Sequence, residues 1–295
     1  MNRRKNVDTE LHLPRLERQP FEPRALKSIL LSTMTVTATI IACIPLFSVL
    51  IMLLYRGGKR LNLELFYALP PTAFETGGGF ANAIIGTLFM VGVAICVSVP
   101  FGILAAIYLA EIGPASKIAV IARFCAKIMT GLPSILAGVF AYASVVLLMG
   151  SYSAWAGGIA LSLLMIPVVL LTAEEAIKMV PQTMKEAAVG MGCTPFQAML
   201  KIILPVAMPG IVTGVVLAVS RAAGETAPLL FTALFSDYWL KANEPTASLA
   251  VLIYNYSGMP FENQIELAWA ASLVLVLMVF VLNIIGRTIG RRKKI

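Results

Sequence analysis

Charged residues are scarce in this sequence, and histidine is nearly absent. Of 295 residues, 13% are charged and 59% are hydrophobic, whereas an average soluble domain has about 25% charged residues. The one histidine, His12, lies in a charged stretch near the N-terminus. A histidine-based catalytic or metal site is therefore excluded, and no serine or cysteine has a placed base that would make it a nucleophile.

Paired cysteines and nucleotide-binding motifs are also missing. The four cysteines lie far apart without a CxxC spacing, which excludes a disulfide framework and a zinc knuckle. The sequence has no G-x-x-x-x-G-K-[ST] phosphate loop, and its glycine run at 77–79 has no lysine after it. We therefore expect no catalytic residues, no metal and no cofactor in this chain, and no ATP hydrolysis by it alone.

The sequence consists mainly of long apolar blocks. Each block is roughly 20 to 30 residues long, which is enough to cross about 30 Å of hydrocarbon at 1.5 Å per residue. We place six blocks, at about 29–55, 80–110, 124–149, 155–172, 202–235 and 267–286. The prediction is an all-α membrane protein with six transmembrane helices.

The predicted organisation follows these blocks. It consists of an N-terminal tail at 1–28, a first transmembrane helix at 29–55, a core of five helices at 80–287 with a polar loop at 174–205, and a basic tail at 288–295. Basic clusters precede the first block and follow the last, which predicts that both termini are cytoplasmic. This placement explains the net charge of +8 through topology and contact with lipid head groups, and it argues against nucleic acid as a partner.

The polar segment at 185–205 is too polar to lie in lipid and too rich in helix-forming residues to be a linker. Gly190, Gly192 and Pro195 predict a turn between two short helices. We expect a helix-turn-helix knob on the cytoplasmic face, whose small alanines let the groove of a partner come close.

The same segment resembles the EAA loop of bacterial ABC import permeases. The resemblance is carried by Glu186-Ala187-Ala188, then Gly192, then Ile202-x-Leu204-Pro205. In that family the loop docks into a separate ATPase subunit, which binds ATP and Mg and whose closure it couples to the membrane helices. The resemblance implies a coupling role for Glu186, Ala187, Ala188 and Gly192; the alternative is an ordinary amphipathic loop.

Arg221 and Glu225 are charged residues inside the fifth apolar block. Four residues of spacing place them on one helix face, and Arg221 lies roughly 24 Å along a helix from Pro205. A charge at that depth costs several kcal/mol unless it is paired or wetted. The pair is either a structural lock between two helices or part of an anion path, with Arg221 donating to oxyanion oxygens and Glu225 holding the arginine between passages.

Two hydroxyls flank a Gly131/Pro133 break in the third block. Thr130 and Ser134 are candidate donors to the same path, although a hydroxyl that bonds back to its own helix is the more common arrangement. Gly210-x-x-x-Gly214 in the fifth block predicts close helix packing.

Three more stretches, at 75–87, 132–140 and 221–234, resemble the phosphate-specific permease subunits of ABC importers, of the PstA type. The similarity covers nearly the whole chain from about residue 30, and the run R-x-x-G-E-T-A-P-L, which includes Thr226, is its most specific part. It implies a type I ABC importer permease fold and a phosphate path that includes Arg221 and Glu225. Some relatives carry an arginine where this chain has Leu171, so the partner permease would supply a second arginine.

The resemblance also implies the assembly. Expected partners are a second permease (PstC type), two ATP-binding subunits (PstB type) and an external phosphate-binding protein (PstS type), in a bacterial inner membrane. The residues themselves leave open another oxyanion such as sulfate, molybdate or phosphonate. They also leave open a secondary transporter that uses Arg221 and Glu225 for ion coupling, and a membrane assembly or sensor subunit that transports nothing.

Overall fold

The computed structural model describes residues 23–72 and 74–291, and the chain divides into two units, residues 1–51 and 52–295. Helix α1 (Pro23–Lys59) supplies all of the described part of the first unit and the start of the second. It is longer at both ends than the predicted helix at 29–55. Proline is tolerated in the first turn of a helix, and the Ala-Leu-Lys that follows favours helix, which explains the early start. Of the predicted tail at 1–28, residues 23–28 form the start of α1, and residues 1–22 lie outside the described residues.

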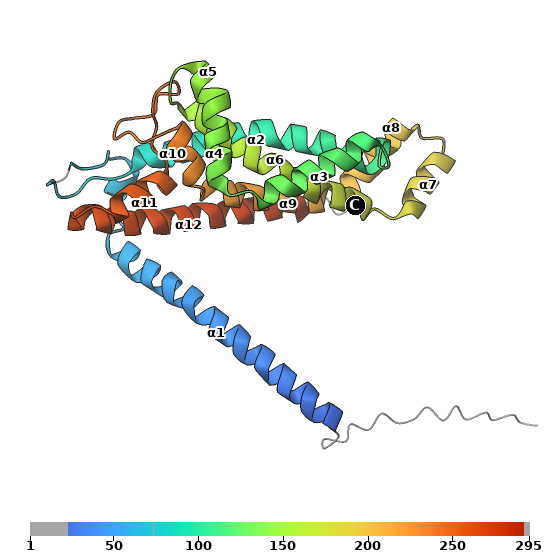
Figure 1. The fold of residues 1–295 in the computed structure, drawn as a ribbon, viewed down its shortest axis with the longest axis horizontal. Coiled ribbons are helices and arrows are strands. Elements are labelled where there is room, and N and C mark those ends of the chain that lie inside the picture. The colour runs from blue at the N-terminus through green and yellow to red at the C-terminus, as the bar shows by residue number, and fades with distance from the viewer. Residues whose placement is uncertain (1–22, 73, 292–295) are drawn as a thin grey trace, which may run out of the picture. The chain divides into compact units, whose positions relative to one another are not determined.

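Every regular element in the described part of the second unit is a helix (Figure 1). The α-helices are α2 (Ala81–Ile107), α3 (Lys117–Gly131), α4 (Ser134–Ala141), α5 (Leu147–Met149), α6 (Ala154–Lys178), α7 (Gln182–Gly190), α8 (Pro195–Ala198), α9 (Leu204–Ala223), α10 (Ala227–Thr232), α11 (Leu249–Ser257) and α12 (Glu262–Arg291). A 3₁₀ turn, η1 (Leu63–Phe66), and three π turns, η2 (Tyr108–Ile112), η3 (Tyr142–Val146) and η4 (Met199–Ile203), complete them. The predicted basic tail at 288–295 is helical as far as Arg291.

The number of apolar spans agrees with the predicted six. Within the described ranges, five helices are long and apolar enough to cross a membrane, and the count is six when the bent pair at 117–131 and 134–149 is taken as one span. The pair is bent by 110°, so the predicted third block is two helices. Leu132 adopts an extended conformation, with ψ of 140°, because the ring of Pro133 disfavours the helical conformation in the residue before it.

Helix α6 lies at the centre of the second unit and packs against α2, α3, α4, α9 and α10. Small residues permit the close approach that membrane helices use for packing. A Cβ atom on Gly158 would lie 2.6 Å from the Val93 side chain of α2, and one on Gly102 would lie 2.7 Å from Val169. Ser153 caps the start of α6 by accepting a hydrogen bond from the backbone of Ala156 at 3.2 Å.

Helix α9 packs against α6 through the two glycines that the sequence singled out. A Cβ on Gly210 would lie 2.7 Å from Ala176, and one on Gly214 would overlap the hydroxyl of Thr172, so the predicted close packing is confirmed. Another side of α9 meets α12, where the Asn283 amide donates to the Ser220 hydroxyl at 2.7 Å. Two sides of α9 are thus covered within this chain.

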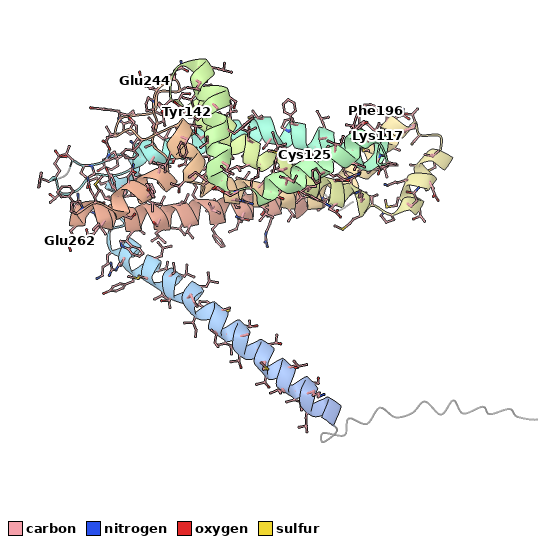
Figure 2. All side chains as sticks on the ribbon, viewed as in Figure 1. Lys117, Cys125, Tyr142, Phe196, Glu244 and Glu262 are labelled. Atoms are coloured by element: carbon pink, nitrogen blue, oxygen red, sulfur yellow. The ribbon has the colours of Figure 1, made fainter. Side chains whose placement is uncertain are left out.

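The second unit has two distinct ends (Figures 1 and 2). Helices α7 and α8 lie at one end, where Figure 2 labels Phe196. Helices α10 and α11 and the start of α12 lie at the other, near Glu244 and Glu262. We call these the α7/α8 end and the α10/α11 end.

A glycine substitution in α2 tests this packing. A Cβ on Gly86 would overlap the backbone carbonyl of Ala247, whereas a Cβ on Gly92, two turns along the same helix, meets nothing within 4 Å. We expect Gly86→Ala to cost about 1–3 kcal/mol through overpacking and to lower the thermal midpoint of the purified protein in detergent. Gly92→Ala is the matched control, and an equal fall in both variants would contradict the packing described.

Candidate functional site

The knob at the α7/α8 end is built by a left-handed turn and a helix cap. Gly192 has φ of +85°, a conformation that suits glycine because it has no Cβ. The backbone N–H of Gly192 donates to Val189 at 2.9 Å, and that of Cys193 donates to Ala188 at 3.1 Å, which closes the end of α7. Thr194 and Gln197 then form a capping box at the start of α8.

The predicted coupling residues all lie on this knob. Glu186 and Ala187 are exposed on α7, Ala188 is buried beneath them, and Gly192 is exposed in the turn. The second helix of the knob differs from the prediction, because α8, η4 and α9 form one continuous helix over 195–223. The wider π turn at η4 comes just before Pro205 and accommodates its ring, so proline does not end the helix there.

Large apolar side chains cover the outside of the knob. Its most exposed large apolar residues, with Met179 at the end of α6, are Met179, Val189, Met191 and Phe196, three of which are over 70% exposed. Exposed apolar patches on a protein mark contacts with a partner or with a membrane. We call these four residues the knob surface.

The knob is tied to the membrane helices by an ion pair. The Lys185 ammonium on α7 contacts the Glu111 carboxylate in η2, at the end of α2. Both side chains are about four-fifths buried, so water screens the pair less than it would at an open surface. No sequence pattern predicts this contact, because 74 residues separate the partners along the chain.

A second ionic cluster lies under the same end of the unit. The Arg123 guanidinium of α3 donates to the Glu174 carboxylate of α6 at 2.6 Å, and also to the backbone carbonyls of Leu109 and Pro114. Lys178 lies 2.6 Å from the same carboxylate, whose side chain is 3% exposed. The i,i+4 spacing of Glu174 and Lys178 was the one sequence signal for this cluster. It locks α3, α6 and the end of α2 together.

Arg221 and Glu225 lie at the α10/α11 end of α9. The guanidinium Nε is 3.4 Å from the carboxylate, and the two side chains are 50% and 16% exposed. Helix α9 ends at Ala223, and Thr226 precedes α10. Arg221 lies in the last turn of α9 and Glu225 lies two residues after its end. In the described residues, the ion pair therefore does not link α9 to a second helix.

Arg221 continues an exposed stripe along α9. Gly210, Thr213 and Leu217 precede it on the same face and are also exposed. A shallow groove of about 450 Å³ follows this stripe between α9 and α6, and Leu171, Thr172 and Glu175 form its other wall. Gly210, at the start of the stripe, still borders α6, and Arg221, at its other end, lies beyond the residues that line the groove.

The other two predicted path residues, Thr130 and Ser134, make no hydrogen bond to Arg221 in the described residues. Thr130 donates to the carbonyl of Lys127 in its own helix at 2.8 Å. Ser134 begins α4, which packs on α10 where a Cβ on Gly138 would lie 2.7 Å from Pro228. Within the described ranges no hydrogen bond joins either hydroxyl to the Arg221–Glu225 pair. The described residues also contain no group of three His, Cys, Asp or Glu side chains that would hold a metal.

Comparison with known proteins identifies the family. Residues 98–295 match the family described as "Binding-protein-dependent transport system inner membrane component". The chain is 42% identical to a phosphate transport system permease protein PstA of Haemophilus influenzae, over 83% of this chain and 87% of that protein. It is 36% identical to a probable PstA of Methanocaldococcus jannaschii, over 82% of this chain and 85% of the other.

Solved structures share the fold at low sequence identity. An importer of the acidic polysaccharide alginate aligns with a TM-score of 0.64 at 17% identity, over 92% of this chain and 100% of that chain. The inward-facing MetNI methionine ABC transporter aligns with a TM-score of 0.58 at 21% identity, over 72% and 94% of the two chains. The fold is therefore that of an ABC importer permease.

Removal of one carboxylate tests the buried ionic cluster. We expect Glu174→Ala to lower the free energy of unfolding by roughly 2 kcal/mol, less than the about 3–5 kcal/mol of a fully buried pair, since Lys178 is partly in water. The matched control is Glu175→Ala on the next, exposed position of the same helix. Thermal unfolding in detergent measures both, and equal midpoints for the two variants would contradict a stabilising cluster.

Proposed function

The chain belongs to the family of binding-protein-dependent transport system inner membrane components, and we propose that it is one of two permease subunits of an ATP-driven phosphate importer. The substrate follows from relatives of 36–42% identity that are phosphate transport permeases over more than four-fifths of the chain. The observation in this structure that carries the proposal is the exposed arginine of α9. Arg221 is a cation within an apolar block, and its side chain is 50% exposed among the described residues of the second unit.

A second permease subunit completes the path in this proposal. The stripe from Gly210 to Arg221 and the groove beside it form one wall, and a related permease of the PstC type supplies the opposite wall. The guanidinium then points into a narrow, partly dry space, where its forked donors suit two oxygens of a phosphate. Glu225 competes for the same guanidinium at 3.4 Å and so limits how tightly the anion is held.

The knob surface is the proposed docking site for the ATPase. Its exposed apolar side chains and the small Ala187 suit a groove on an ATP-binding subunit of the PstB type, which binds ATP and Mg. The knob has two rigid connections to the membrane part, the continuous helix from Pro195 to Ala223 and the Lys185–Glu111 ion pair. Closure of two ATPase subunits would thereby move α9 and α2, and the path would open outward in the ATP-bound state.

The proposed topology places the knob in the cytoplasm. With α1 counted, six crossings bring both termini to the side of the α7/α8 end, in the inner membrane of a bacterium. The α10/α11 end then faces outward, where it receives phosphate from a binding protein of the PstS type. The basic flanks of the first and last helices agree with this orientation.

Loss of the arginine fork tests the path. We expect Arg221→Gln to reduce labelled-phosphate uptake roughly tenfold or more, because a charge-assisted hydrogen bond to the anion contributes about 1.5–3 kcal/mol. Cells that lack only this chain are complemented with wild type or variant, with sulfate as competitor. Arg221→Lys keeps the charge without the fork and is expected to restore uptake only in part.

The outcomes of that experiment separate the alternatives. Sulfate that suppresses wild-type uptake would assign the path to another oxyanion. Uptake that is unaffected when the ATPase partner is inactivated would indicate a secondary transporter. Full uptake by Arg221→Gln, at wild-type levels of protein in the membrane, would remove Arg221 from the path.

Exchange of charges tests the ion pair of the knob. We expect Glu111→Lys and Lys185→Glu each to reduce the phosphate transported per ATP hydrolysed, because like charges then repel between α7 and the end of α2. The double variant restores an opposite-charge pair and is expected to recover much of the coupling. The measurement is uptake and ATPase activity of the purified complex in liposomes; a double variant no better than the single ones would contradict a positioning role.

A further inference from the structure

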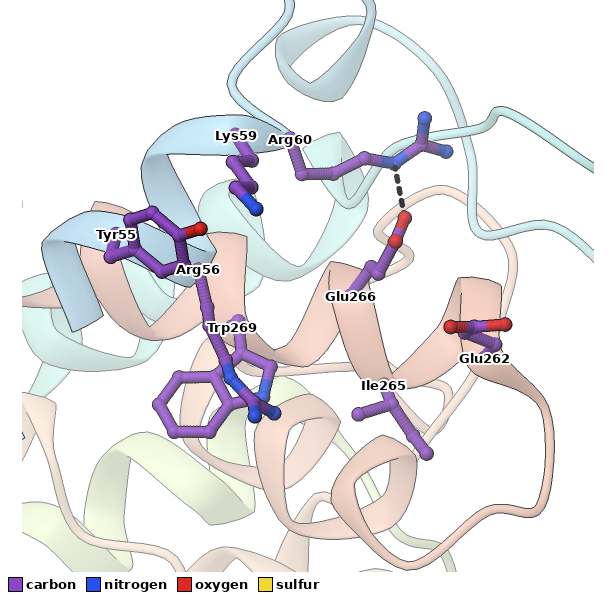
Figure 3. A pocket seen from close by; sticks show the side chains of 8 residues that line it. All are labelled: Tyr55, Arg56, Lys59, Arg60, Glu262, Ile265, Glu266 and Trp269. Carbon is purple, nitrogen blue, oxygen red and sulfur yellow. Dashed lines mark ion pairs between the residues drawn. The ribbon is translucent and has the colours of Figure 1, made fainter. Parts of the chain in front are cut away.

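A pocket at the α10/α11 end collects most of the basic residues there. Two chain segments lie at this end, 56–79 and 236–266. Together they contain four lysines and arginines, which are Arg56, Lys59, Arg60 and Lys241. The first three line one pocket of about 510 Å³ between the last turn of α1 and the first turns of α12 (Figure 3). This volume lies in the range of about 300–1,000 Å³ that is typical of small-molecule sites.

The two walls of the pocket are held together by close packing. A Cβ on Gly57 of α1 would lie 2.7 Å from the backbone carbonyl of Trp269 in α12, and the Leu53 side chain, one turn earlier, is buried. The pocket is therefore a built feature of the second unit, and the cations above it have fixed positions relative to α12.

The three cations differ in how they are used. Arg60 is occupied by the protein itself, since it donates to Asn263 at 2.8 Å and to the carbonyl of Gly77 at 3.0 Å, and lies 3.9 Å from Glu266. The Arg56 guanidinium stacks on the Trp269 ring at 5.4 Å, and the Lys59 ammonium lies 4.1 Å from the Tyr55 ring. No acidic side chain pairs with Arg56 or Lys59 in the part of the chain that the structure describes, so their N–H groups are free to bind an anion.

The position of the pocket indicates which anion. It lies where two membrane-spanning helices, α1 and α12, reach the end of their apolar stretches. Tyrosine and tryptophan, such as Tyr55 and Trp269, are enriched in membrane proteins at the level of the lipid head groups. Cationic side chains at this level attract lipid phosphates. Glu262, exposed on the rim of the pocket and without an ion pair among the described residues, disfavours a small free anion but accepts hydrogen bonds from a donor.

We propose that this pocket binds the head group of a phospholipid that carries both a phosphodiester and a hydrogen-bond donor. Arg56 and Lys59 bind the phosphate, and Glu262 accepts from the hydroxyl of a glycerol or the ammonium of an ethanolamine head group. Phosphatidylglycerol and phosphatidylethanolamine fit this description, whereas phosphatidylcholine lacks the donor. The lining of this pocket shares no residue with the Arg221–Glu225 pair.

Lipid titration of the whole transporter tests the site. The purified complex is delipidated, titrated with each of the three lipids, and its bound lipid is counted by native mass spectrometry. We expect the double variant Arg56→Gln/Lys59→Gln to weaken phosphatidylglycerol and phosphatidylethanolamine binding by about thirtyfold, at about 1 kcal/mol for each cation. Glu262→Gln, an exposed change, is expected to weaken phosphatidylethanolamine more than phosphatidylcholine.

The control is Lys241→Gln. It removes the fourth cation of this end of the unit, which pairs with Glu244 outside the pocket, and it is expected to leave lipid binding unchanged. Thermal midpoints of all variants show whether the pocket is still folded. Three results would overturn the proposal: phosphatidylcholine binding as tightly as the other lipids, unchanged binding in the double variant, or displacement of the lipid by millimolar inorganic phosphate. The last would assign the pocket to free phosphate.

Discussion

A bilayer has no water to bind backbone N–H and C=O groups, so each crossing of this chain is helical and each break within an apolar block must be covered by protein or line a wet path. Two such breaks occur, at Leu132–Pro133 and at Gly224–Thr226. The helices that follow them, α4 and α10, pack on each other. The Arg221–Glu225 pair lies at the second break, so irregular backbone and membrane charge occur together, as they do where protein lines a cavity.

The same constraint determines how the helices of this chain associate with one another. Within lipid there is no hydrophobic driving force for helices to associate, so they pack through close contacts between small residues. Glycines bring α2 and α9 close to α6, and Ser220 joins α9 to α12. What stays open on α9 is the stripe that ends in Arg221. A guanidinium there costs several kcal/mol against lipid, which makes a second protein surface the reasonable neighbour.

The sequence was sufficient for features that depend on local chemistry. Apolar length predicted the spans, Pro133 predicted the break in the third block, and Gly192 with Pro195 predicted the turn of the knob. It did not predict tertiary geometry, such as the 110° bend between α3 and α4 or the packing of α4 on α10. The ion pairs of Glu111 and Arg123 join residues far apart in the chain. Pro205 did not mark a break between the knob and the membrane helix, because the π turn η4 leads into α9 and the helix is continuous from Pro195 to Ala223.

The continuity of that helix has a mechanical consequence. From Pro195 in the knob to Arg221 the chain is helical over about 39 Å at 1.5 Å per residue, with no non-helical residue between them. If an ATPase subunit moves the knob surface, as proposed, this continuous helix would carry the movement to the Arg221 guanidinium as a tilt or rotation. In the proposed cycle, the ion pair of Lys185 with Glu111 would transmit the same motion to α2, and α6, with its buried carboxylate, would be the body against which both helices move. Glu225 follows the end of α9, so a rotation of α9 would change its distance from Arg221 and, with it, the affinity of the proposed anion site.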